Sequence, residues 1–172
     1  MTTPAARSRK TRTSARSQRV RPGRVATTHP VPPATPPDFF NPSPSLNLAL
    51  KHVATASSSA AGSDPAGAVD GLAFTNWSAG PEIRPSLTID LGAATSFQRV
   101  TVKQPLLPTF IAMQLQTSID GVQFKTVAVA LTLEPMVTVT LPAPVSARFV
   151  RLQIEGALGG HAVVKELSVR PQ

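Results

Sequence analysis

Ser86-Leu87-Thr88-Ile89-Asp90-Leu91 places an apolar side chain at every second position. Such alternation is typical of an antiparallel strand with one buried and one solvated face. The same period of two recurs in four more segments, residues 99–103, 111–116, 137–141 and 150–154. In the second of these we expect Ile111, Met113 and Leu115 to face the core. The body of the chain is therefore predicted to be all β.

Three further segments, residues 48–57, 122–130 and 162–170, bring the expected number of strands to about eight. Turn signals separate the strands, at Gly92, 105–108, Asp120-Gly121, 142–144 and 156–160. An Asp-Gly pair between apolar residues is a strong hairpin signal. We expect only residues 65–71 to form a short helical turn. For residues 46–172 we predict an eight-stranded antiparallel β-sandwich of the jelly-roll type, which is large enough to fold unaided.

The charge of the chain is concentrated at its beginning. Of 17 basic residues, eight precede Asp38, which is the first of nine acidic residues, so the rest of the chain is neutral. Nine of the 18 prolines lie at or before Pro44. We therefore predict a basic arm (residues 1–24) and a proline-rich linker (residues 25–45), disordered or ordered only by a partner. The bases of the arm are Arg7, Arg9, Lys10, Arg12, Arg16, Arg19, Arg21 and Arg24.

Several classes of protein are excluded by composition. The absence of cysteine rules out a disulfide scaffold and a cysteine-ligated metal site. No apolar run is long enough to span a bilayer, and no apolar segment follows the arm as a secretory signal requires. The chain contains no Gly-x-Ser-x-Gly or Walker-type motif, and its histidines, His29, His52 and His161, are too scattered for a zinc site. We predict a binding or structural protein, not an enzyme.

Seven short motifs occur in a characteristic order, and they span about residues 50–170. They are Ala54–Ser58, Ala68–Gly71, Thr75–Trp77, Leu87–Gly92, Gln114–Phe124, Ala147–Leu152 and Glu166–Val169. Together they resemble the discoidin family (clotting-factor C-type domains), which includes galactose-binding-like carbohydrate-binding modules. The resemblance implies a β-sandwich without catalytic activity. Its ligands, bound through loops at one end, would be glycans, phospholipid head groups or proteins.

The resemblance also implies one structural calcium ion, which members of the family often carry. The corresponding loop contains Asp70, Gly71 and Thr75, and the late-strand carboxylate is Glu166. Calcium binds six to eight oxygens from carboxylates, hydroxyls and turn carbonyls, so Asp70, Thr75 and Glu166 are the expected ligands. The alternative is that Asp70 caps a turn and Glu166 is a solvated surface acid.

A glycan site would draw on the loops. Family members that bind sugars bring a histidine or arginine, an asparagine and an aromatic ring together, and Asn76, Arg84, Phe110 and His161 are the candidates here. Phe110 could instead close one end of the core. Trp77 is expected in the core, where the family packs this residue. Arg148 and Arg151 are expected to position strands rather than to contact a ligand.

Three functions remain open. The first is a non-catalytic recognition module, including a stand-alone, lectin-like protein. The second, which we favour, is a structural or decoration protein of a larger assembly, such as a virus or phage particle. Residues 1–45 would anchor it, and the sandwich would display a glycan-binding or other surface-binding site. The third is nucleic-acid binding through the arm, which offers attraction to the phosphate backbone but no base readout. Alternatives for the arm are a solvated tail and an organelle transit peptide.

The expected location follows from the missing secretion signal. A lectin that works outside a cell would usually carry such a signal, whereas a particle protein assembles in the cytoplasm and needs none. We therefore expect this protein at the surface of a virus or other particle.

Overall fold

The computed structural model describes residues 47–171, so the predicted basic arm and linker lie outside the described residues. This range contains eight strands and one short 3₁₀ helix, and no helix in it is long and apolar enough to cross a membrane. The elements are β1 (Val53–Ala56), η2 (Pro65–Ala68), β2 (Trp77–Ser78), β3 (Ser86–Lys103), β4 (Phe110–Ser118), β5 (Lys125–Leu131), β6 (Met136–Ala157), β7 (Val163–Val164) and β8 (Glu166–Arg170). All strand pairs are antiparallel, and the predicted all-β sandwich is confirmed.

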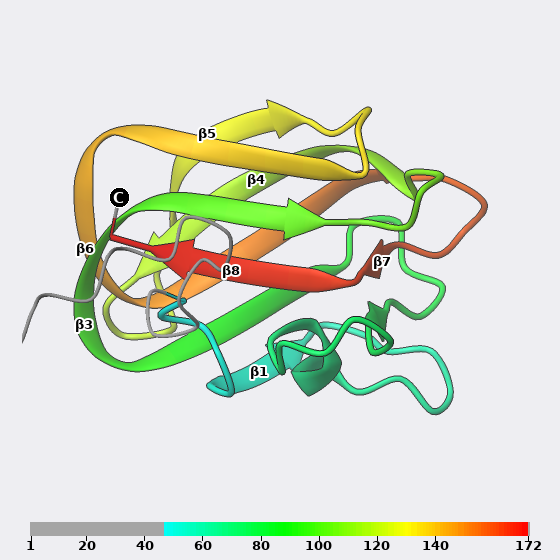
Figure 1. Ribbon diagram of the computed structural model, residues 1–172, viewed down its shortest axis with the longest axis horizontal. Coiled ribbons are helices and arrows are strands. Elements are labelled where there is room, and N and C mark those ends of the chain that lie inside the picture. Colours follow the sequence, from blue (N-terminus) through cyan, green and yellow to red (C-terminus); the bar gives the residue numbers. More distant parts are fainter. Residues whose placement is uncertain (1–46, 172) are drawn as a thin grey trace, which may run out of the picture. The chain divides into compact units, whose positions relative to one another are not determined.

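Two long strands, β3 and β6, belong to both layers of the sandwich. The first half of β3 pairs with β1 and with the second half of β6, whose other neighbour is β4, followed by β5. The second half of β3 pairs with β8 and with the first half of β6. Figure 1 shows both strands bending back at the same end of the molecule. We call the β1-β3-β6-β4-β5 side the large layer and the β8-β3-β6 side the small layer.

The predicted turns at Gly92 and at residues 142–144 are wrong, because the chain stays in strand at both places. Each coincides with a break in the register between β3 and β6. Gly92 has a φ of 79°, which bends β3 without ending it. Around Gln98 the register moves from Val145 to Thr140, so residues 141–144 bulge out of the ladder. Proline lacks the N–H that a ladder needs, and a bulge is a place that tolerates it.

The predicted number of eight strands is correct, but the predicted boundaries between the strands are not. The predicted strands 86–91 and 99–103 are both parts of β3, and 137–141 and 150–154 are both parts of β6. Two short strands, β2 and β7, pair with each other and were not predicted separately. The Asp120-Gly121 signal does mark the β4–β5 hairpin, and the short helical turn within 65–71 is η2.

The predicted burial of Ile111 is also wrong, whereas Met113 and Leu115 are buried as expected. Ile111 is 40% exposed and lies against Gly156, where a Cβ atom would come within 3.0 Å of it. Phe110 is fully buried instead, at the end of the sandwich. The Thr132 hydroxyl donates to the Phe110 carbonyl at 2.7 Å, so the segment after β5 closes over this end.

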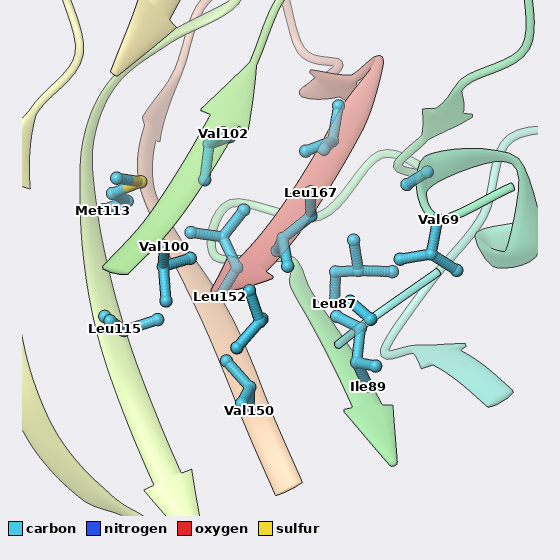
Figure 2. Close-up of a cluster of buried hydrophobic side chains, with 14 of the residues drawn as sticks. Val69, Leu87, Ile89, Val100, Val102, Met113, Leu115, Val150, Leu152 and Leu167 are labelled. Carbon is cyan, nitrogen blue, oxygen red and sulfur yellow. The ribbon is translucent and has the colours of Figure 1, made fainter. Parts of the chain in front are cut away.

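The core lies between the two layers (Figure 2). The large layer contributes Leu87 and Ile89 from β3, Val150 and Leu152 from β6, and Met113 and Leu115 from β4. The small layer contributes Val100 and Val102 from β3 and Leu167 from β8. These side chains come from the alternating positions of the sequence, so the period of two determines the faces that meet.

Candidate functional site

The loop that precedes β2 is organised by one carboxylate. Asp70 Oδ1 accepts hydrogen bonds from the Leu72 backbone N–H and from the Thr75 hydroxyl, both at 2.8 Å. The Thr75 hydroxyl also lies 3.1 Å from the Leu72 carbonyl oxygen. Gly71 has a φ of 78°, and a Cβ atom there would come within 2.9 Å of Leu50. The Asp-Gly pair therefore brings carboxylate, hydroxyl and carbonyl oxygens together, because a side chain after Asp70 would be strained and crowded.

Glu166, at the start of β8, faces this loop with a carboxylate oxygen that lacks a partner. Its Oε2 is buried and makes no hydrogen bond to any of the described residues. Burial raises the pKa of Glu166 to about 7, and the negative charge of Asp70 adds to the rise, while the Gly71 N–H and Lys103 oppose it. The alternative of a solvated surface acid is therefore wrong for Glu166. The prediction that Asp70 caps a turn is confirmed, because its Oδ1 accepts from the backbone N–H of Leu72.

Three of the predicted sugar-contacting residues each have a different partner within the protein. Arg84 Nε lies 2.7 Å from Glu155 Oε2, His161 Nδ1 lies 3.2 Å from the Ala79 carbonyl oxygen, and Asn76 Oδ1 accepts from the Ser78 hydroxyl at 3.0 Å. Within residues 47–171 no hydrogen bond or ion pair joins Arg84, Asn76 and His161 to one another.

The proposed stacking role of Phe110 is wrong. Its side chain is 0% exposed, because it fills the end of the core beneath the loop closed by Gln104 and Thr132. Phe110 thus closes one end of the sandwich, which was the alternative interpretation. Trp77 is buried as predicted, and its Nε1 donates to the Ser58 carbonyl and the Ser59 hydroxyl.

Sequence reasoning missed Phe74, which is 97% exposed in the loop between Asp70 and β2. Its neighbours Thr75 and Asn76 line a surface cavity of about 560 Å³, together with Ser63 and Asp64. The available signal was the position of Phe74 between two polar motif residues and outside any alternating segment. The loop thus presents an aromatic ring beside polar groups.

Arg148 and Arg151 make contacts within the protein, as predicted. Arg148 binds Asp90 through two nitrogens, at 2.8 and 2.7 Å. Arg151 donates to Thr88 at 3.0 Å, and its guanidinium lies 3.5 Å from the centre of the Phe124 ring. Both arginines join β6 to its neighbours on the outer side of the large layer.

The sequence and the fold both identify the family. The family model described as F5/8 type C domain matches residues 53–167, which is most of the chain. The chain belongs to the F5/8 type C domain family. None of the curated proteins matches it.

Several solved structures share the fold of this F5/8 type C domain. Chitosan-binding module 2 of a chitosanase/glucanase from Paenibacillus sp. IK-5, solved with chitotriose, is 27% identical, with a TM-score of 0.65 over 72% of this chain and 99% of that one. The family 32 carbohydrate-binding module of Clostridium perfringens NanJ, solved with galactose, is 22% identical, with a TM-score of 0.65 over 72% and 97%. The lectin domain of lectinolysin, solved with Lewis B antigen, is 18% identical, with a TM-score of 0.62 over 73% and 96%.

The oxygens around Asp70 are of the kind that the predicted calcium ion would bind. Of the three expected ligands, Thr75 donates to Asp70, and Asp70 is close enough to Glu166 for its charge to raise the pKa of Glu166, whose Oε2 makes no hydrogen bond within residues 47–171. Within residues 47–171 no three acidic, histidine or cysteine side chains are grouped so that they could hold a metal ion, so the remaining ligands would be carbonyl oxygens such as that of Leu72. When bound, the ion would neutralise two adjacent carboxylates and fix the loop that carries Phe74.

Proposed function

We propose that this F5/8 type C domain is a non-catalytic glycan-binding module whose sugar contacts lie on the loop from Asp70 to Asn76. The observation that carries the proposal is the Phe74 ring, which is 97% exposed and directly precedes Thr75 and Asn76, two polar residues that line a surface cavity. Burying a phenylalanine side chain stabilises a protein by about 1.5–3 kcal/mol relative to leaving it in water, and the exposed Phe74 ring does not contribute this free energy. A ligand that covers the ring would recover part of it.

A sugar matches the chemistry of this loop. Sugar rings present an apolar C–H face that packs on an aromatic ring, and hydroxyls that both donate and accept hydrogen bonds. Asn76 presents an amide whose oxygen already accepts from Ser78. Ser63 and Asp64 add a hydroxyl and a carboxylate on the same cavity. The relatives solved with chitotriose, galactose and Lewis B antigen support a glycan as the ligand class.

The proposal is tested by glycan-array binding of the full chain, followed by titration with each sugar that binds. Phe74→Ala should weaken binding at least tenfold without lowering the melting temperature, because the ring contacts little of the protein. Leu106→Ala is the matched control, since Leu106 is similarly exposed on another loop and should retain full affinity. Unchanged affinity in Phe74→Ala would reject this site.

The Arg84–Glu155 pair is the competing sugar site on the same domain. Gln114 Nε2 donates to Glu155 at 3.3 Å and Gln153 Nε2 donates to the Arg84 carbonyl at 2.8 Å, so amides and charges gather there. Arg84→Gln should leave glycan affinity unchanged if Phe74 marks the site. A selective loss in Arg84→Gln would assign binding to the outer side of the large layer instead.

We further propose that residues 1–45 attach this module to a larger assembly, such as a virus or phage particle, at whose surface it displays the sandwich. The support is the concentration of eight bases in residues 1–24 next to an electrically balanced body. Deletion of residues 1–45 should leave a folded, soluble body that no longer incorporates into the assembly. If the truncated protein still incorporates into the assembly, residues 1–45 are not the attachment. If the full chain binds glycans equally well without any assembly, the result favours a stand-alone lectin.

A further inference from the structure

The outer face of the small layer carries three rows of mostly polar side chains, which line a surface cavity of about 1060 Å³. Residues of β3 at positions i, i+2 and i+4 point outwards and each is flanked by a partner from β6 and one from β8. The three rows across the layer are Thr140–Arg99–Arg170, Thr138–Thr101–Ser168 and Met136–Lys103–Glu166.

Two arginines lie directly opposite each other in the first row. Arg99 and Arg170 are direct cross-strand partners, a relation that places Cβ atoms about 4.5–5.5 Å apart. Neither side chain forms a hydrogen bond or ion pair with any residue in the range 47–171. Lys103 and Lys165 line the same cavity, so four cations gather around it, with Glu166 as its single acidic residue. Like charges directly opposite each other destabilise a sheet, so folding does not explain this arrangement.

The middle row separates the cations with hydroxyl groups. The Thr101 and Thr138 hydroxyls lie 2.9 Å apart, and Ser168 is buried beside them. Along β3 the step from Arg99 to Lys103 is about 13 Å, because a strand rises about 3.3 Å per residue. The cavity therefore suits a ligand with acidic groups at both ends of a hydroxyl-bearing stretch.

We propose that this face is a second ligand site, which binds an acidic oligosaccharide that carries sulfate or carboxylate groups. Arg99 and Arg170 hold one acidic group, since paired guanidiniums bind such oxyanions through several parallel hydrogen bonds. Lys103 holds the next acidic group, and the threonine hydroxyls contact the sugar between them. Among residues 47–171 no aromatic side chain lines the cavity, so this part of the chain does not supply the stacking that favours single-stranded nucleic acid. The cavity borders Gly71, Leu72 and Ala73 of the loop that carries Phe74, but Phe74 itself does not line it, and the two arginines lie in the row farthest from Glu166.

The test uses the full chain with the eight arm bases replaced by glutamine, so that the arm does not contribute to anion binding. The probe is a heparin-derived octasaccharide, measured by calorimetry at physiological salt. Arg99→Gln/Arg170→Gln should weaken binding at least tenfold and should not lower the melting temperature, because it removes a repulsion. Lys51→Gln/Lys125→Gln removes the same charge away from the cavity and should change the affinity less than twofold.

Three results would overturn the proposal. Equal losses in the two double variants would mean that only net charge matters. Full affinity in Arg99→Gln/Arg170→Gln would place binding elsewhere, and a lower melting temperature would assign these arginines to folding. If a single-stranded oligonucleotide of matched charge binds as tightly as the octasaccharide or more tightly, the ligand of this face is nucleic acid and not an oligosaccharide. Binding of neutral sugars at the Phe74 loop should be unaffected throughout, so failure of this site and failure of the proposed function are distinguishable.

Discussion

Arg148 and Asp90 are joined by two parallel hydrogen bonds, from Nε to Oδ1 at 2.8 Å and from Nη2 to Oδ2 at 2.7 Å. Asp90 ends the first half of β3, and its Oδ1 also accepts from the backbone N–H of Gly92 at 2.8 Å. Arg148 comes from the stretch of β6 that runs alongside. The pair therefore ties the two long strands together where β3 leaves the large layer.

The Asp90–Arg148 pair should make stability depend on acid pH. The Arg148 guanidinium lowers the pKa of Asp90 to about 2, from an ordinary value near 3.8. Because the folded pKa is the lower one, the contribution is complete above about pH 4 and is lost as the pH falls towards 2. Arg148→Gln should lower the melting temperature at pH 7, and the difference from wild type should narrow by pH 2. Lys125→Gln serves as the control, and a deficit in Arg148→Gln that is equal at every pH would contradict this assignment.

Calcium should stabilise the protein through Glu166. The ion would supply the counter-charge that the buried Glu166 oxygen lacks, so excess calcium should raise the melting temperature by several degrees and chelator should reverse it. Glu166→Gln should abolish the calcium response, whereas Glu134→Gln, away from the loop, should retain it. If chelator leaves the melting temperature of the wild type unchanged, the protein has no calcium site here.

Gly67, in η2, should tolerate alanine less well than Gly62 does. A Cβ atom on Gly67 would come within 2.8 Å of the Asn76 backbone oxygen, so the loop must shift, at a cost of about 1–3 kcal/mol. Gly62 has nothing within 4 Å, so alanine there meets no clash and costs only the about 1–2 kcal/mol of a left-handed backbone, at its φ of 75°. Urea unfolding of both variants measures the difference. Equal losses would show that η2 does not pack closely on Asn76.

The basic arm should give a recognisable salt dependence if it binds nucleic acid. Eight contacts with single-stranded phosphates predict a slope of about −6 for log affinity against log salt, at about −0.7 per contact. Deletion of residues 1–24 should bring the slope close to zero. A slope near zero in the intact chain, or the same slope without the arm, would exclude the arm as a nucleic-acid binder.

Much of the fold and part of the site follow from local sequence. Leu87 and Ile89 point inwards because they alternate with polar residues. The Asp70-Gly71 turn forms because the Asp70 carboxylate accepts from the Leu72 backbone N–H and glycine tolerates a positive φ. Only the resemblance to the family predicted that Glu166 lies near that turn, because the two are far apart in the sequence. Local sequence does not distinguish the bends at Gly92 and Pro142 from turns, because a turn and a bulge favour the same residues.

The sequence by itself determined that the body is a two-layered β structure, because alternation of side chains along a strand requires no knowledge of the partner strand. Only the tertiary structure decided which phenylalanine is covered, Phe110 or Phe74, because burial of a loop residue depends on the segments that close over it. The register between β3 and β8 likewise decided that Arg99 meets Arg170. The position of a residue along its strand determines the face on which its side chain lies, but the pairing of strands determines which side chains lie beside it.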